Sequence, residues 1–256
     1  MGNRPSPLPT ASNAARNSYF VPSSSVYQPN HDILAALRRH LPPDHLPSPP
    51  DKLPIIYHED YNISFYGIEK LHPFDSQKYR HVVDMLCKDG LIKTKDDLIT
   101  APPPPSLDAL SDVHSMQYLR ALESSSLKVA QVTELAPLAF VPAFLTRSKV
   151  LSPMKRMVSG TLLAGVVALE RGWSLHLGGG QHHAHYSDGG GWCCYDDITF
   201  LIRALARASE GLLKNVMIVD LDVHQGNGHE RSKLHFMRSA GTDDVNMPNT
   251  VIQGFC

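Results

Sequence analysis

Histidine and aspartate side chains that could bind a metal ion gather between residues 176 and 229. This stretch holds His176, His182, His183, His185, Asp220, Asp222, His224 and His229. The four cysteines of the chain form no CxxC pair, so the sequence does not indicate a thiolate site. Imidazole nitrogens and carboxylate oxygens bind many catalytic zinc ions, and the stretch therefore predicts a zinc site with these two donor types.

The run Asp220-Leu221-Asp222-Val223-His224 follows an apolar segment, Val216–Val219, that has the composition of a strand. If the extended backbone continues, Asp220, Asp222 and His224 point to one side, because side chains alternate along a strand. A carboxylate and an imidazole placed in this way could share a catalytic zinc ion, which takes three protein ligands and a water. A DxDxH sequence at a strand end also fits a hydrogen-bonded cap, and the motif by itself leaves both interpretations open.

A second motif combines a glycine turn with paired imidazoles. Gly178–Gly180 allow a sharp backbone turn, and His182 and His183 follow it. Adjacent buried histidines each need a hydrogen-bond partner, so they are unusual as core filling. Next to a metal-bound water they could act as general base and general acid. Trp192, in the glycine-rich loop that follows, could line an apolar passage or serve packing alone.

The elements around these motifs predict a parallel sheet. Trp173–Leu177 and Val216–Val219 are expected strands, and Asp196–Ser209 between them has apolar residues at helical spacing. A strand, a helix and a strand at this distance form a βαβ unit with parallel strands. In such sheets the chemistry collects beyond the carboxyl ends of the strands, where both histidine motifs lie.

Four further elements are expected on the amino-terminal side. Order begins with a strand at Leu53–Tyr57, and a helix runs from Asp75 to Gly90. Another helix starts at Ser111 or Asp112. Residues 154–171 form a longer helix with small residues on one side, which would let it pack closely on a sheet.

Residues 1–52 are rich in Pro, Ser and Asn and predict a disordered leader with one short helix, Asp32–Leu41. The first residues also fit a loose myristoylation pattern, and residues 1–31 have the composition of a transit peptide. The formal net charge of −1 does not indicate a basic surface that would bind nucleic acid. No apolar run is long enough for a membrane span, and the cysteine usage suits a reducing compartment, here the nucleus or the cytoplasm.

The motifs together resemble the histone deacetylase family, over roughly residues 53–231. The resemblance is carried by Gly178–His183, Gly189–Cys193, Asp220–Glu230, Tyr61–Ile63, Glu69–Asp75, and His114 with Tyr118 and Leu119. Gln225–Arg231 and the His-Pro-Phe-Asp run at 72–75 are similar to class IV of that family. The fold implied is α/β, a three-layer sandwich around a parallel sheet, shared with arginases.

The resemblance implies a role for each matching residue. Asp222 and His224 match two of the three zinc ligands. His182 matches the general base, and His183 matches the histidine that protonates the leaving lysine amine. Asp220 matches the carboxylate that orients the general base.

Three further positions and one further ion follow from the same resemblance. Asn227 stands where many relatives carry an aspartate behind the second histidine, which would leave His183 less readily held as imidazolium. Gly191 and Trp192 match the loop that lines the acyl-lysine tunnel. Family members also hold a structural potassium ion.

The resemblance ends after Arg231, whereas the family continues with a third zinc ligand, an oxyanion-stabilising tyrosine and further strands. We therefore expect a leader (1–52), a partial histone deacetylase domain (53–231) and a divergent tail (232–256), as in a truncated or alternatively spliced product. Ala240–Asp243 resembles the motif of the third ligand, but Asp243 lies only 13 positions after Glu230, too few for the intervening elements.

The expected function is zinc-dependent hydrolysis of acetyl-lysine or other acyl-lysine amides in histone tails or other proteins, weak or absent here because ligands are missing. An arginase-like dinuclear hydrolase would need an aspartate two residues after His224, where Gly226 stands. An interpretation of a different class is a non-catalytic fragment that binds partners, such as corepressor proteins, or competes with a longer enzyme.

Overall fold

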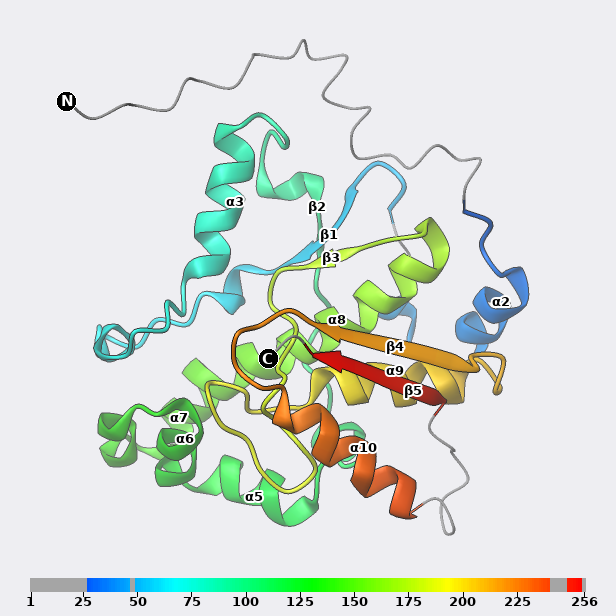
Figure 1. Cartoon of the computed structure of the whole chain (residues 1–256). Helices are drawn as coiled ribbons and strands as arrows, with labels where there is room; N and C mark the ends of the chain where they lie inside the picture. The colour runs from blue at the N-terminus through cyan, green and yellow to red at the C-terminus, as the bar shows by residue number, and fades with distance from the viewer. Residues whose placement is uncertain (1–26, 47–48, 240–247, 255–256) are drawn as a thin grey trace, which may run out of the picture.

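The computed structural model describes residues 27–46, 49–239 and 248–254 (Figure 1). The strands of this part are β1 (Leu53–Tyr57), β2 (Leu98–Thr100), β3 (Leu175–His176), β4 (Asn215–Asp220) and β5 (Asn249–Gly254). The helices of this part are α2 (His31–His40), α3 (Lys78–Lys88), α4 (Leu107–Leu110), α5 (Met116–Ser124), α6 (Ser126–Thr133), α7 (Ala143–Thr146), α8 (Ser152–Arg171), α9 (Asp197–Ala208) and α10 (Asn227–Ser239). The described strands pair in parallel as β2-β1-β3 and as β4-β5, so the predicted α/β class is confirmed.

The central strand β1 starts at Leu53, as predicted, and pairs on both sides. Ile55, Ile56 and Tyr57 are all buried, although successive side chains of a strand point to opposite faces. This continuous apolar run is typical of a parallel strand covered on both faces.

Helix α8 carries the predicted small residues, and two of its glycines make close approaches. A Cβ on Gly160 would lie 2.4 Å from Nε2 of His176 in β3. A Cβ on Gly165 would lie 2.3 Å from Cδ1 of Leu201 in α9. The small residues therefore bring α8 close to the sheet on one side, as predicted, and close to α9 on the other, which the sequence did not indicate.

The prediction of a βαβ unit is only partly confirmed. Its helix is present as α9, whose N-cap Asp196 accepts a hydrogen bond from the Thr199 backbone N–H at 3.0 Å. The first strand shrinks to Leu175–His176 and pairs with β1, whereas β4 pairs with β5 through six residue pairs. The two strands therefore belong to different hydrogen-bonded sheets, but both run toward the same side of the molecule (Figure 1).

The predicted leader and tail contribute to the fold where the structure describes them. Helix α2 buries Ile33, Leu34 and Leu37 in the main core, so residues 30–46 are not a mobile leader. Residues 1–26 lie outside the described residues, as does Asp243. The divergent tail supplies the end of α10 and strand β5.

Two predicted helix starts are also wrong by a few residues. Asp75 does not cap α3, because its Oδ1 accepts from the Gln77 backbone N–H in a turn before the helix. Ser115 rather than Ser111 caps α5, which leaves His114 ahead of the helix. Within the described ranges, no helix combines the length and apolar character required to cross a membrane.

Candidate metal and catalytic site

A buried carboxylate holds the glycine turn that precedes the histidine pair. Asp197, the first residue of α9, accepts hydrogen bonds from the backbone N–H groups of Gly180 (2.9 Å) and Gln181 (2.8 Å). Gly180 has a φ of +88°, a conformation that other residues rarely adopt. Thr161 of α8 donates a third hydrogen bond to Asp197 at 2.6 Å. The turn is thus fixed to two helices, and the sequence had suggested no role for Asp197.

Each histidine of the pair has its own partner. His182 Nδ1 donates to Asp220 Oδ2 at 2.9 Å, and His183 Nδ1 donates to Asn227 Oδ1 at 3.1 Å. The two rings lie with their centroids 4.0 Å apart. Burial acts to raise the pKa of Asp220, but hydrogen bonds from His182 and from the Asp222 backbone N–H hold that pKa below its usual value. Because both Nδ1 atoms are protonated and occupied, the Nε2 atoms are free for proton transfer.

Asp222 and His224 do not continue strand β4. The strand ends at Asp220, so the predicted alternation of three side chains along one strand is wrong. The two residues still meet, because Asp222 Oδ1 accepts hydrogen bonds from the backbone N–H of His224 (2.8 Å) and from its ring Nδ1 (2.9 Å). The first of these bonds is the main cause that lowers the pKa of Asp222. The His224 ring centroid lies 6.1 Å from that of His183, so the pair adjoins the histidine couple.

His229 is a neighbour of the site to which the sequence assigned no role. Its side chain is buried, and its Nε2 lies 3.6 Å from Asp220 Oδ2, the oxygen that also accepts from His182. One potential ligand atom from each of His182, Asp220 and His229 lies within 4.8 Å of the other two. Asp222 and His224 belong to no such group of three among the described residues.

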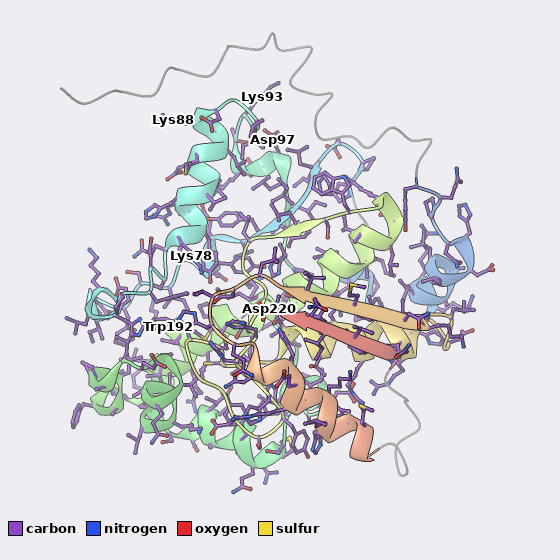
Figure 2. All side chains as sticks on the ribbon, viewed as in Figure 1. Lys78, Lys88, Lys93, Asp97, Trp192 and Asp220 are labelled. Atoms are coloured by element: carbon purple, nitrogen blue, oxygen red, sulfur yellow. The ribbon has the colours of Figure 1, made fainter. Side chains whose placement is uncertain are left out.

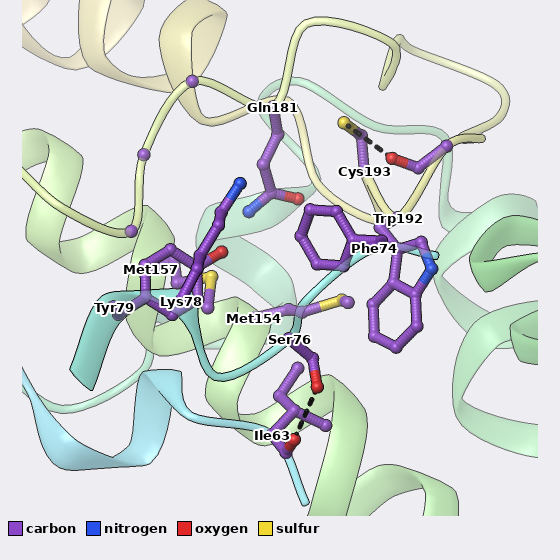
Figure 3. A pocket seen from close by; sticks show the side chains of 14 residues that line it. Ile63, Phe74, Ser76, Lys78, Tyr79, Met154, Met157, Gln181, Trp192 and Cys193 are labelled. Atoms are coloured by element: carbon purple, nitrogen blue, oxygen red, sulfur yellow. Dashed lines mark hydrogen bonds between the residues drawn. The ribbon is translucent and has the colours of Figure 1, made fainter. Parts of the chain in front are cut away.

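Trp192 is buried. Its ring stacks on Phe74 with centroids 5.0 Å apart, and only 5% of its surface is accessible. Trp192 and Gly191 line one pocket together with Phe74 and Gln181 (Figure 3). Gly191 also lines a second hollow with His183 and Asn227. Asp220 and Trp192 both lie in the central part of the molecule, near the carboxyl ends of the strands (Figure 2).

A second buried carboxylate, Asp196, lies beside the site and links α9 to α10. Its side chain accepts hydrogen bonds from the Ser232 hydroxyl and the Thr199 backbone N–H, and its own backbone N–H donates to His114 Nε2 at 2.9 Å. Burial raises the pKa of Asp196 to about 7, despite the hydrogen bonds that it accepts. Burial lowers the pKa of His114 to about 4, so this ring is neutral in the folded protein.

Asp196→Asn should therefore change stability in a pH-dependent way. The carboxyl group ionises at its ordinary pKa of 3.8 in the unfolded chain but at about 7 in the folded one. Between these values the folded state binds the extra proton, so this group makes stability fall as pH rises. Asn cannot ionise, so Asp196→Asn lacks this loss of stability. The free energy of unfolding of Asp196→Asn minus that of wild type, measured by urea titration, should therefore increase between about pH 5 and about pH 8. An equal difference at both pH values would contradict the assignment.

Residues 72–238 match the family model described as the histone deacetylase domain. The chain belongs to this family. The match extends beyond Arg231, where the sequence resemblance was expected to end, to the last turn of α10. His182, Asp220 and Asp222 all lie inside the matched range.

Curated relatives support the same assignment. Histone deacetylase 2 of Arabidopsis thaliana is 49% identical over 183 residues, which cover 71% of this chain and 46% of that protein. An uncharacterized protein of Picosynechococcus sp. is 31% identical and covers 68% of this chain and 54% of its own length. The acetoin utilization protein AcuC of Staphylococcus aureus is 25% identical, covering 65% of this chain and 42% of its own length. The chain thus spans about half the length of these relatives.

A crystal structure of the HDA15 HD domain has the same fold as this histone deacetylase domain. It superposes with a TM-score of 0.52 at 17% identity and covers 71% of this chain and 50% of that one. The predicted arginase/deacetylase-like fold is confirmed.

Proposed function

We propose that this histone deacetylase domain takes part in the zinc-dependent hydrolysis of acyl-lysine amides in histone tails or other proteins. The observation that carries the proposal is the pair of hydrogen-bonded histidines, His182 with Asp220 and His183 with Asn227, beside His224. Two imidazoles with separate partners can act as separate proton carriers, which hydrolysis of an amide requires.

Each histidine has a distinct task in this proposal. Asp220 holds the His182 ring with Nδ1 protonated, so Nε2 can take a proton from the attacking water. His183 delivers a proton from Nε2 to the departing lysine amine. Because Asn227 is neutral, it orients the His183 ring without adding the negative charge that would stabilise an imidazolium. Gly191 and Trp192 form the wall along which the acyl-lysine side chain enters.

Asp222 and His224 would hold the zinc ion. A carboxylate oxygen and an imidazole nitrogen are donors that zinc prefers, and they lie side by side next to His183. The ion, when bound, polarises the carbonyl and acidifies a water molecule. The pair is exposed and supplies two of the three protein ligands usual for such ions, so we expect residues 1–256 alone to bind zinc weakly and to turn over slowly. The structural potassium ion stays a prediction.

One observation also favours a non-catalytic role. Asp222 and His224 have no third ligand nearby among the described residues. A polypeptide with two ligands could bind partners, such as corepressor proteins, or compete with a longer enzyme without turning over substrate. Assignment to class IV and location in the nucleus or cytoplasm are likewise proposals that rest on the sequence.

Zinc content and turnover separate the two roles. We expect purified residues 1–256 to take up zinc in metal analysis, His224→Ala to lose most of it, and His81→Ala, an exposed histidine of α3, to keep it. Removal of one of two ligands should weaken zinc binding by about 10-fold or more. Slow hydrolysis of an acetyl-lysine peptide that a chelator abolishes would support the enzyme. Zinc binding unchanged in His224→Ala would overturn the assigned ligands, and fast turnover would contradict the weakness expected of the polypeptide.

A further inference from the structure

The pocket behind Trp192 combines apolar walls with hydrogen-bond donors. Phe74, Met154, Met157 and Trp192 supply the apolar surface, and α3, α8 and the glycine turn frame it (Figure 3). Its free volume is about 80 Å³. At about 30 Å³ per water molecule, that volume corresponds to roughly two or three waters, enough for the end of a short acyl chain.

Gln181 turns an unpaired amide N–H toward this pocket. Its Oε1 accepts hydrogen bonds from the backbone N–H groups of Cys194 (3.0 Å) and Tyr195 (3.2 Å), which fixes the orientation of the amide. Only 6% of the residue is exposed, and its Nε2 is buried without a hydrogen-bond partner. A buried donor without an acceptor is costly, so the position favours a ligand that brings an acceptor.

Lys78 adds a positive charge at the same pocket. Its Nζ lies 4.4 Å from the centroid of the Phe74 ring, and among the described residues it has no recorded ion pair. Figure 3 shows the Lys78 and Gln181 side chains both extending into the pocket. Burial raises the pKa of the neighbouring Cys193 thiol to about 12, so that group stays neutral and does not neutralise the lysine. The pocket therefore offers two donors, one of which carries a positive charge.

The pocket adjoins the histidine pair. Gln181 directly precedes His182, and a Cβ on Gly191 would lie 2.7 Å from Cδ2 of His183. An acyl group whose carbonyl lies at the histidines can therefore extend its far end toward Gln181.

We propose that this pocket receives the terminal carboxylate of a short dicarboxylic acyl group on lysine, such as succinyl, through Gln181 Nε2 and Lys78 Nζ. The methylene groups of the chain lie against Phe74 and the methionines, and the carboxylate accepts from both donors. The inference rests on the proposed function, because it names the acyl class that the same site would bind.

Binding measurements on residues 1–256 test the proposal without relying on turnover. Calorimetric titration with Nε-succinyl-lysine and with Nε-butyryl-lysine should give about 10- to 100-fold tighter binding of the succinyl compound, the worth of charge-assisted hydrogen bonds. Free succinate should compete with the succinyl compound for the pocket.

Two variants locate the preference. Gln181→Glu keeps an oxygen acceptor for Cys194 and Tyr195 but replaces the donor with a carboxylate oxygen, so the succinyl preference should disappear. Thermal unfolding of this variant checks that it is folded. Lys78→Met should reduce the preference by about 10-fold. Lys88→Met, at the other end of α3, is the matched control and should leave it unchanged (Figure 2).

Equal affinity for the two compounds, no binding of either, or a preference that survives both pocket variants would overturn the proposal. His224→Ala distinguishes it from the proposed function, because Asp222 and His224 do not line this pocket. Failure of zinc binding with an intact succinyl preference would count against the proposed hydrolysis alone. Normal zinc binding without the preference would count against the pocket alone.

Discussion

Asp197→Ala is expected to lower the free energy of unfolding by about 3–5 kcal/mol, since it leaves buried donors without an acceptor. The carboxylate accepts from two backbone N–H groups of the glycine turn and from the Thr161 hydroxyl, and the residue is fully buried. Thr161 can turn to other acceptors, but the N–H groups of Gly180 and Gln181 have none nearby that the structure records. Urea-induced unfolding followed by circular dichroism gives the difference directly.

The loss should also reach the site, because the turn carries His182 and His183. Asp84→Ala, at an exposed position of α3, is the matched control and should change stability by less than about 0.5 kcal/mol. If Asp197→Ala unfolds with the same midpoint as that control, the carboxylate is not what holds the turn.

Gly228→Ala is the second substitution with a large expected effect. A Cβ at Gly228 would lie 2.3 Å from the Ala184 carbonyl oxygen and 2.4 Å from the His182 carbonyl oxygen, both of them backbone atoms. The Gly228 N–H also donates to the His182 carbonyl at 2.9 Å, so α10 packs directly on the histidine segment. The backbone has to move apart, and we expect destabilisation of about 2–4 kcal/mol.

The same displacement should separate His183 from Asn227, which begins α10. Gly190→Ala provides the control, because a Cβ there meets no atom within 4 Å. The two proteins can be compared by thermal unfolding and by the ¹⁵N shifts of the histidine rings. Equal unfolding midpoints and unchanged ring shifts in Gly228→Ala would show that the contact is not tight.

Local patterns in the sequence determined much of the secondary structure and the main chemical components. Strand β1 and helix α9 were predicted closely, because apolar spacing and caps act within a few residues. The histidine pair and Asp220 were recognised as site residues by their type and by their position after apolar runs. Their catalytic roles remain predictions, although the structure brings them into contact.

Only the tertiary structure decided which residues support that site. Asp197, Gln181 and His229 acquire their contacts from segments distant in sequence, and no local pattern distinguishes a helix start or a turn residue from a buried anchor. The predicted pairing of these strands was wrong for the same reason. The two-residue strand β3 pairs with β1, and β4 pairs with β5, a segment beyond α10. Residue type and spacing are local properties of the chain, whereas burial, pairing and the partners of a polar group depend on the packing of distant segments.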